Sequence, residues 1–155
     1  MDLPADAAER RAGRSVHRYR REFHACYNAS IMIVGIEHVA IASPDPQKLA
    51  QWYVETLNFK INYNSGKTVF IKAANGSMIE IITSEGALGP RTMKDPGLRH
   101  LAIAVSDFDA EYNRLKGRGV QFVSEPVDSK GVKLVFFTDP DGNYLHLLQR
   151  ETPLP

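Results

Sequence analysis

The chain has 155 residues, of which 43% are hydrophobic and 24% charged, a profile typical of a single globular domain. A net charge of +1 gives no indication of a nucleic-acid partner or of a membrane surface, and no apolar run approaches the roughly 20 residues that span a bilayer. The single cysteine, Cys26, cannot form an internal disulfide, so we expect a cytoplasmic setting.

Residues 1–31 differ in composition from the rest of the chain. The first 30 residues contain six arginines and no lysine, whereas all eight lysines follow. This stretch has no apolar centre, which excludes a secretory signal, and its four acidic residues argue against a transit peptide. We expect an extension outside the core, followed by one domain at 32–150. A functional arm, or a natural start at Met32, are the alternatives.

The first half of the domain begins with a predicted strand at 36–43, IEHVAIAS, whose alternation places His38 on one face with two alanines. A helix is predicted over 45–59, because Asp45 is suited to cap its N-terminus. Trp52 and Tyr53 follow its apolar stripe, which indicates core packing rather than a substrate platform. Three further strands are predicted at 60–64, 68–74 and 77–83.

The second half repeats this order after a loop at 84–97. LRHLAIAV predicts a strand at 98–105, and the helix predicted over 106–119 can be capped by Ser106 or Asp107. Three more strands are predicted at 120–125, 133–139 and 143–149. The sequence therefore predicts an α+β fold of two tandem βαβββ modules, at about 34–84 and 98–149.

The repeat aligns His38 with His100, and Glu80 with His146. These are the only three histidines after residue 31. Each residue alone has an ordinary explanation, as a hydrogen-bonded strand histidine or a solvent-facing glutamate. Together, three imidazoles and one carboxylate form a ligand set for one divalent metal ion, Ni, Zn, Fe, Co or Mn, with Cu also suited. We expect the four to converge if the modules pack pseudo-symmetrically.

Four stretches, IEHVAIAS, MIEII, RHLAIAV and FFTDPDGNYLHLLQ, resemble the glyoxalase, bleomycin resistance and extradiol dioxygenase group, the vicinal oxygen chelate superfamily. The resemblance covers about residues 34–149. It implies that the two modules form an incomplete barrel around a metal, with His38, Glu80, His100 and His146 at the ligand positions. It also implies a homodimer and a small-molecule substrate.

The function implied by this resemblance is a metal-dependent lyase or isomerase, similar to lactoylglutathione lyase, whose substrate chelates the metal through vicinal oxygens. Glu80 is then the candidate catalytic base. The alternatives within the superfamily are an iron-dependent extradiol dioxygenase, a metal-dependent antibiotic-resistance transferase and a drug-binding protein.

Two positions depart from the glyoxalase I pattern. His146 stands where glyoxalase I enzymes usually have a glutamate, which argues against a proton relay between two carboxylates. Ala42 stands where bacterial glyoxalase I proteins tend to have an arginine that helps to hold glutathione, which argues against glutathione as a substrate.

Other residues are candidates for substrate contacts. Charged side chains in or beside the linking loop can bind an anion or simply be solvated: Arg91, Lys94 and Arg99. Strand residues with large side chains can line the cavity or fill it, and alternation leaves both readings open: Phe70, Met78, Phe136 and Tyr144.

Overall fold

The structure is a computed structural model that describes residue 33, residues 35–86, residue 89 and residues 92–154. One compact unit, Glu37–Pro155, holds both βαβββ modules. The extension expected at 1–31 lies outside the described residues. Among the described helices, none has the length and apolar character needed to cross a membrane.

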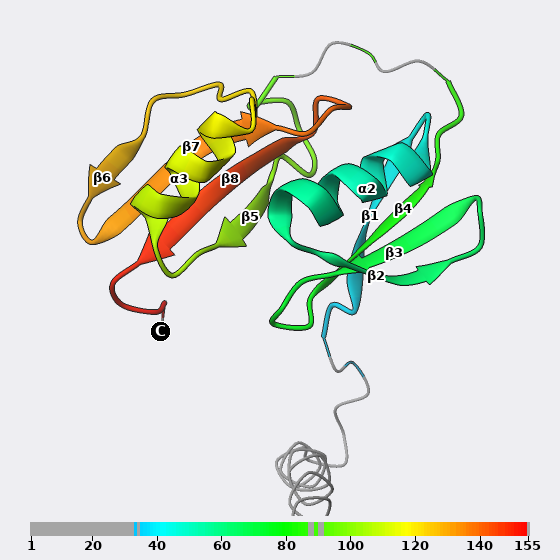
Figure 1. The fold of residues 1–155 in the computed structure, drawn as a ribbon, viewed down its shortest axis with the longest axis horizontal. Coiled ribbons are helices and arrows are strands. Elements are labelled where there is room, and N and C mark those ends of the chain that lie inside the picture. The colour runs from blue at the N-terminus through cyan, green and yellow to red at the C-terminus, as the bar shows by residue number, and fades with distance from the viewer. Residues whose placement is uncertain (1–32, 34, 87–88, 90–91, 155) are drawn as a thin grey trace, which may run out of the picture. The chain divides into compact units, whose positions relative to one another are not determined.

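The first module contains β1 (His38–Ser43), α2 (Pro46–Leu57), β2 (Lys60–Asn64), β3 (Thr68–Lys72) and β4 (Met78–Thr83) (Figure 1). Its sheet has the order β1-β4-β3-β2, with β1 and β4 parallel and the other pairs antiparallel. The carboxylate of Asp45 accepts a hydrogen bond from the Lys48 N–H and so caps α2, as predicted. Asn58, with φ of 57°, ends the helix in the left-handed conformation.

The second module repeats this plan with β5 (Leu101–Ala104), α3 (Phe108–Gly117), β6 (Val127–Ser129), β7 (Val132–Thr138) and β8 (Tyr144–Arg150). Its strand order, β5-β8-β7-β6, matches that of the first sheet. Asp107, rather than Ser106, caps α3 by accepting from the Ala110 N–H. The predicted α+β fold of two βαβββ modules is confirmed, and the two sheets do not close into a barrel.

Two local predictions in the second module are wrong. Residues 120–125 form no strand; only a bridge joins Phe122 to Phe137, and the strand β6 comes later. The Ser124 hydroxyl accepts from the Phe136 N–H, and Pro126 has no N–H to donate, so the pairing is interrupted there. His100 precedes β5 instead of lying within it.

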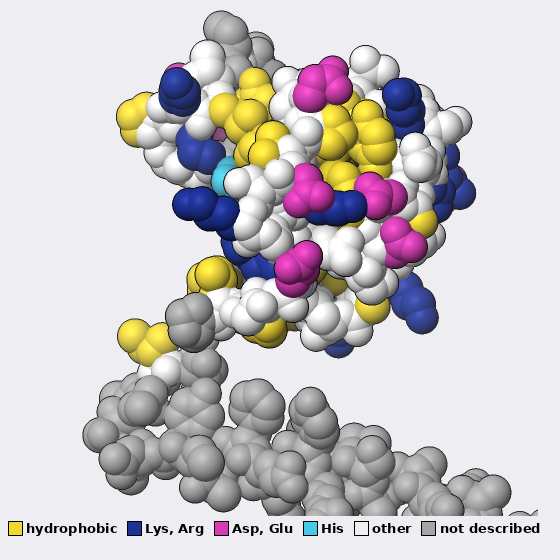
Figure 2. Space-filling view, turned by 90° about the vertical axis from the view of Figure 1, so that its left-hand side faces the viewer, with side chains coloured by type: hydrophobic (Ala, Val, Ile, Leu, Met, Phe, Trp, Pro, Cys, Tyr) yellow, Lys and Arg dark blue, Asp and Glu magenta, His cyan; other side chains and the backbone are white. Residues whose placement is uncertain are grey.

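Each sheet is covered by its helix on one face only. α2 packs on β3 and β4, and α3 packs on β8. In β1 the residues that face α2, Ile41 and Ser43, are buried, whereas Ala40 and Ala42 are exposed. The opposite face therefore carries the residues that were predicted to bind metal. On the side of the molecule shown in Figure 2, acidic, basic and apolar side chains are intermixed rather than segregated.

Side chains in the turn between β7 and β8 accept hydrogen bonds from the first module. The Tyr53 hydroxyl on α2 donates to the buried carboxylate of Asp139 over 3.0 Å, and the Ser43 hydroxyl donates to Asp141 over 2.6 Å. From α3, the Arg114 guanidinium donates to the carbonyl oxygen of Thr56 at the end of α2 over 2.6 Å. Tyr53 is thus a core residue, as predicted.

Candidate functional site

His38 and Glu80 lie together on the open face of the first sheet. β1 and β4 are parallel neighbours, and Ala40 is the register partner of Glu80. The Nε2 atom of His38 comes to 3.2 Å from a carboxylate oxygen of Glu80, and both side chains are partly exposed. A nitrogen and an oxygen this close suit two positions in the coordination shell of one divalent cation.

Glu37 contacts the other ring nitrogen of His38. The His38 Nδ1 donates to the Glu37 carboxylate. This hydrogen bond is the main cause that raises the pKa of His38, with smaller contributions from the charge of Glu80. A carboxylate at Nδ1 favours the tautomer whose Nε2 lone pair is available to a metal. Glu37 is not among the predicted site residues, and its place directly before His38 in the chain is the signal that indicates it.

His100 and His146 form the second pair, with ring centroids 4.5 Å apart. His146 is 9% exposed, and among the described residues neither of its ring nitrogens has a hydrogen-bond partner. Burial is the main cause that lowers the pKa of His146, followed by the positive charges of His100 and Arg150. A buried imidazole without a partner is costly, and a bound metal would supply the missing bond.

Phe70 and Phe136 occupy equivalent positions in the two sheets. Phe70 is the register partner of Glu80, and Phe136 is the register partner of His146. The Phe70 ring lies edge-on to His38 at 5.2 Å, and the Phe136 ring lies edge-on to His100 at 5.4 Å, measured between centroids. Both phenylalanines thus pack against the candidate ligands and restrict where the imidazoles can turn.

The two pairs do not join within one chain. Across the described ranges, no group of three or more histidine, cysteine, aspartate or glutamate side chains is placed to hold a metal ion. The four side chains that were expected to converge therefore lie as two pairs, one in each module. The reason is architectural, because each pair is fixed by its own sheet and the two sheets do not close around a common centre.

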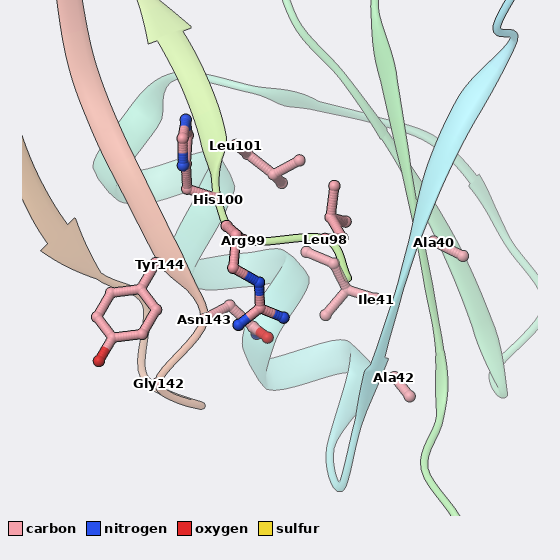
Figure 3. A pocket seen from close by; sticks show the side chains of 10 residues that line it. All are labelled: Ala40, Ile41, Ala42, Leu98, Arg99, His100, Leu101, Gly142, Asn143 and Tyr144. Atoms are coloured by element: carbon pink, nitrogen blue, oxygen red, sulfur yellow. The ribbon is translucent and has the colours of Figure 1, made fainter. Parts of the chain in front are cut away.

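A pocket of about 290 Å³ opens beside His100 (Figure 3). Its walls come from β1, from the chain entering β5 and from the turn before β8. The lining residues are Ala40, Ile41, Ala42, Leu98, Arg99, His100, Leu101, Gly142, Asn143 and Tyr144. The Arg99 side chain lines this pocket, and its guanidinium donates to backbone oxygens of the linking loop (Figure 3).

The remaining predicted contact residues are dispersed. Lys94 is exposed in the linking loop and does not line this pocket, and Arg91 lies outside the described residues. Met78 is partly buried, with its sulfur 3.9 Å from the side-chain nitrogen of Asn62. Tyr144 lines the pocket. Of the two loop cations that the structure describes, Lys94 and Arg99, only Arg99 lines the pocket together with the candidate ligand His100.

The family model of the Glyoxalase/Bleomycin resistance protein/Dioxygenase superfamily matches residues 35–147. YwkD, an uncharacterised protein of Bacillus subtilis, is 28% identical over 130 residues, which are 77% of this chain and 100% of YwkD. The metallothiol transferase FosB of Staphylococcus saprophyticus is 29% identical over 119 residues, 75% of this chain and 77% of FosB. The solved structure of the oxidase ChaP-H2 is similar with a TM-score of 0.62 and 25% identity, over 77% of this chain and 95% of that one.

Proposed function

The chain belongs to the glyoxalase, bleomycin resistance protein and dioxygenase superfamily, and we propose that it is a metal-dependent lyase or isomerase. Its substrate is a small molecule that presents two neighbouring oxygens. The observation that carries this proposal is the buried, unpartnered imidazole of His146 beside His100, among the described residues. Such a group is costly in a folded core, and metal binding accounts for its presence.

The donor set fits a divalent cation. His38, His100 and His146 offer imidazole nitrogens and Glu80 offers a carboxylate, a mixture that suits Ni, Zn, Fe, Co or Mn. When bound, the metal supplies a Lewis acid that stabilises negative charge developing on a substrate oxygen. Because each module holds one pair, we propose that two copies associate. The His38–Glu80 pair of one protomer then meets the His100–His146 pair of its partner.

Glu80 is the proposed general base. Its carboxylate lies on the open face of the first sheet, is partly exposed and is 3.2 Å from the Nε2 atom of His38. It can therefore take a proton from a substrate carbon held on that face. His146 provides no second carboxylate, so the proton that Glu80 accepts must return from Glu80 itself or pass to solvent. This favours a reaction with one proton-transfer residue.

An iron-dependent oxygenase is the second candidate. The sequence similarity to the oxidase ChaP-H2 favours it, and two of the histidines with Glu80 would supply a two-histidine, one-carboxylate iron site. The similarity to FosB raises a metal-dependent thiol transfer as a further alternative. Oxygen consumption by the iron-loaded protein with a catechol, against no consumption with the nickel- or zinc-loaded protein, would favour the oxygenase over the lyase or isomerase.

Calorimetric titration of the metal-free protein with Zn²⁺, Ni²⁺ and Co²⁺ tests the metal proposal. We expect one ion per four-ligand site, and affinity at least about a hundredfold weaker in His38→Ala and in His100→Ala, because each variant loses a ligand bond. His17→Ala, a histidine outside the domain, is the matched control and should bind as the native protein does. Tight stoichiometric binding retained by both ligand variants would contradict the proposal.

A further inference from the structure

We propose that the pocket beside His100 is a carboxylate-binding subsite in which Arg99 receives the acid group of the substrate. This inference rests on the proposed function and narrows the substrate class to small carboxylic acids. It follows from how Arg99 is held, which of its N–H groups are used and what else lines the pocket.

The guanidinium of Arg99 is held in place by backbone carbonyls. Its Nε donates to the Gly97 oxygen over 3.1 Å, one terminal nitrogen donates to the Thr92 oxygen over 2.9 Å, and the other donates to the Pro96 oxygen over 3.1 Å. Three bonds from three different nitrogens fix both the position and the plane of the group. A preorganised guanidinium loses little conformational entropy when it binds an anion.

This arrangement leaves part of the donor capacity unused. An arginine side chain has five N–H groups, and three are occupied, so one on each terminal nitrogen has no partner among the described residues. Two N–H groups on the two terminal nitrogens match the two oxygens of a carboxylate, which arginine commonly binds in a bidentate manner. The partners already present are neutral carbonyls, so they do not neutralise the guanidinium charge.

The charge of Arg99 is not balanced inside the pocket. None of the ten lining residues, all of them described, is an aspartate or a glutamate. Asp95 is the nearby acid, and Arg99 contributes to lowering its pKa. Its carboxylate, however, accepts from the backbone N–H of Thr92 over 2.7 Å and from the Thr92 hydroxyl over 2.9 Å. Asp95 thus organises the loop, and the pocket itself keeps an excess positive charge.

The pocket dimensions and neighbours define the ligand further. About 290 Å³ lies at the lower end of the range for small-molecule sites, which suits a short-chain acid better than a peptidic thiol adduct. Leu98 and Ile41 give the wall an apolar part, and His100 lies in the same lining. In Figure 3 the His100 and Arg99 side chains point in opposite directions, so an acid bound at Arg99 lies in a pocket whose lining His100 shares, away from the His100 ring.

The first test uses the metal-free full-length protein, which separates this subsite from the metal proposal. Backbone amide resonances are followed by NMR during titration with glycolate, with its neutral analogue glycolamide, and with inorganic phosphate. We expect saturable shifts at Leu98, Arg99 and Asn143 with glycolate and at least about tenfold weaker binding of glycolamide, which lacks the charge. Equal binding of glycolate and glycolamide would overturn the proposal, and tighter binding of phosphate than of glycolate would overturn the assignment to a carboxylate.

Variants of Arg99 provide the second test. Arg99→Gln should weaken glycolate binding at least about tenfold. Arg99→Lys keeps the positive charge but loses the planar guanidinium with its two parallel N–H donors, and it should weaken binding less. Lys60→Gln removes one exposed positive charge elsewhere and should bind glycolate as the native protein does. If Arg99→Gln disturbs the loop, a weakened Arg99→Lys variant with a native spectrum still supports the subsite. Native glycolate affinity in a folded Arg99→Gln protein would refute it, whatever the metal titrations show.

Discussion

The imidazole rings of His100 and His146 lie 4.5 Å apart between centroids, and His146 is buried with no hydrogen-bond partner among the described residues. Two neighbouring imidazoles cannot easily both carry a proton, and the positive charge of His100 contributes to lowering the pKa of His146. We therefore expect the unpartnered imidazole to weaken the metal-free fold, and under the proposed function a cation would bond to nitrogens that otherwise lack partners.

Replacement of His146 by leucine should therefore separate stability from function. His146→Leu removes two unsatisfied polar atoms from a buried position and adds apolar contacts with similar volume. We expect the metal-free variant to be as stable as the native protein or more stable, by up to about 2 kcal/mol in urea denaturation at pH 7. Metal affinity should fall at least about a hundredfold. A variant that is clearly less stable without metal would contradict this reading of His146.

The histidines of the metal-free protein should titrate in a defined order. Glu37 raises the pKa of His38, mainly through its hydrogen bond, whereas burial lowers the pKa of His146. Imidazole NMR titration should place His38 above 6.5 and His146 below it. The difference between the two pKa values should become smaller in Glu37→Gln, which removes the negative charge beside the His38 Nδ1. It should stay unchanged in Glu125→Gln, which removes an exposed carboxylate elsewhere. Reversed order of the two histidines would show that these contacts do not form in solution.

The same shifts predict how the stability of the metal-free protein changes with pH. The folded pKa of His146 is below 6.5, so the stability linked to it is lost as the pH falls below 6.5 toward that pKa. The folded pKa of His38 is above 6.5, so its contribution is present below 6.5 and is lost as the pH rises through the folded pKa. Urea denaturation at a series of pH values checks this. Below pH 6.5 the free energy of unfolding should decrease less in His146→Leu than in the native protein.

Much of this organisation could be predicted from the sequence, because the signals are local and repeated. Alternating strand patterns placed His38 with Ala40, and the Asp45 and Asp107 caps lie where short-range rules put them. The equivalent positions of Phe70 and Phe136 beside the two pairs reflect the same internal repeat.

The errors have long-range causes. The interrupted pairing near Phe122 depends on a side-chain hydrogen bond from the Phe136 N–H to Ser124, which no periodicity reveals. The separation of the two ligand pairs depends on how two sheets are arranged in space. The orientation of the Arg99 guanidinium has a local cause instead, because it depends on carbonyls of its own loop, and the hydrophobic pattern carries no information about them.

The junction between the modules should be sensitive to the Tyr53–Asp139 hydrogen bond. Burial raises the pKa of Asp139 and of Tyr53, and the Asp139 carboxylate also accepts from Asn143. Tyr53→Phe removes one buried hydrogen bond and should lower the free energy of unfolding by about 1–2 kcal/mol in urea denaturation. Tyr63→Phe, at an exposed tyrosine, should change it by less than about 0.5 kcal/mol. Equal effects of the two variants would show that the junction bond contributes nothing.

Turnover of the methylglyoxal–glutathione adduct should be weak or absent in the native protein. Imidazole at residue 146 replaces the second carboxylate of glyoxalase I enzymes, and with it one group able to move protons between adjacent carbons. His146→Glu should raise this activity in the metal-loaded protein if the pocket accepts the adduct. Robust native turnover that His146→Glu abolishes would mean that histidine is the functional residue for this reaction.

Mixing of two ligand variants tests most directly whether the four side chains form one metal site. His38→Ala and His100→Ala are each expected to lose tight binding. In a co-expressed mixture, about half of the dimers contain one copy of each variant, and each such dimer regains one intact site. We expect tight metal binding at about a quarter of all sites in the mixture, and none in either variant alone. No recovery of binding in mixed dimers shown by mass spectrometry to contain both variants would contradict it.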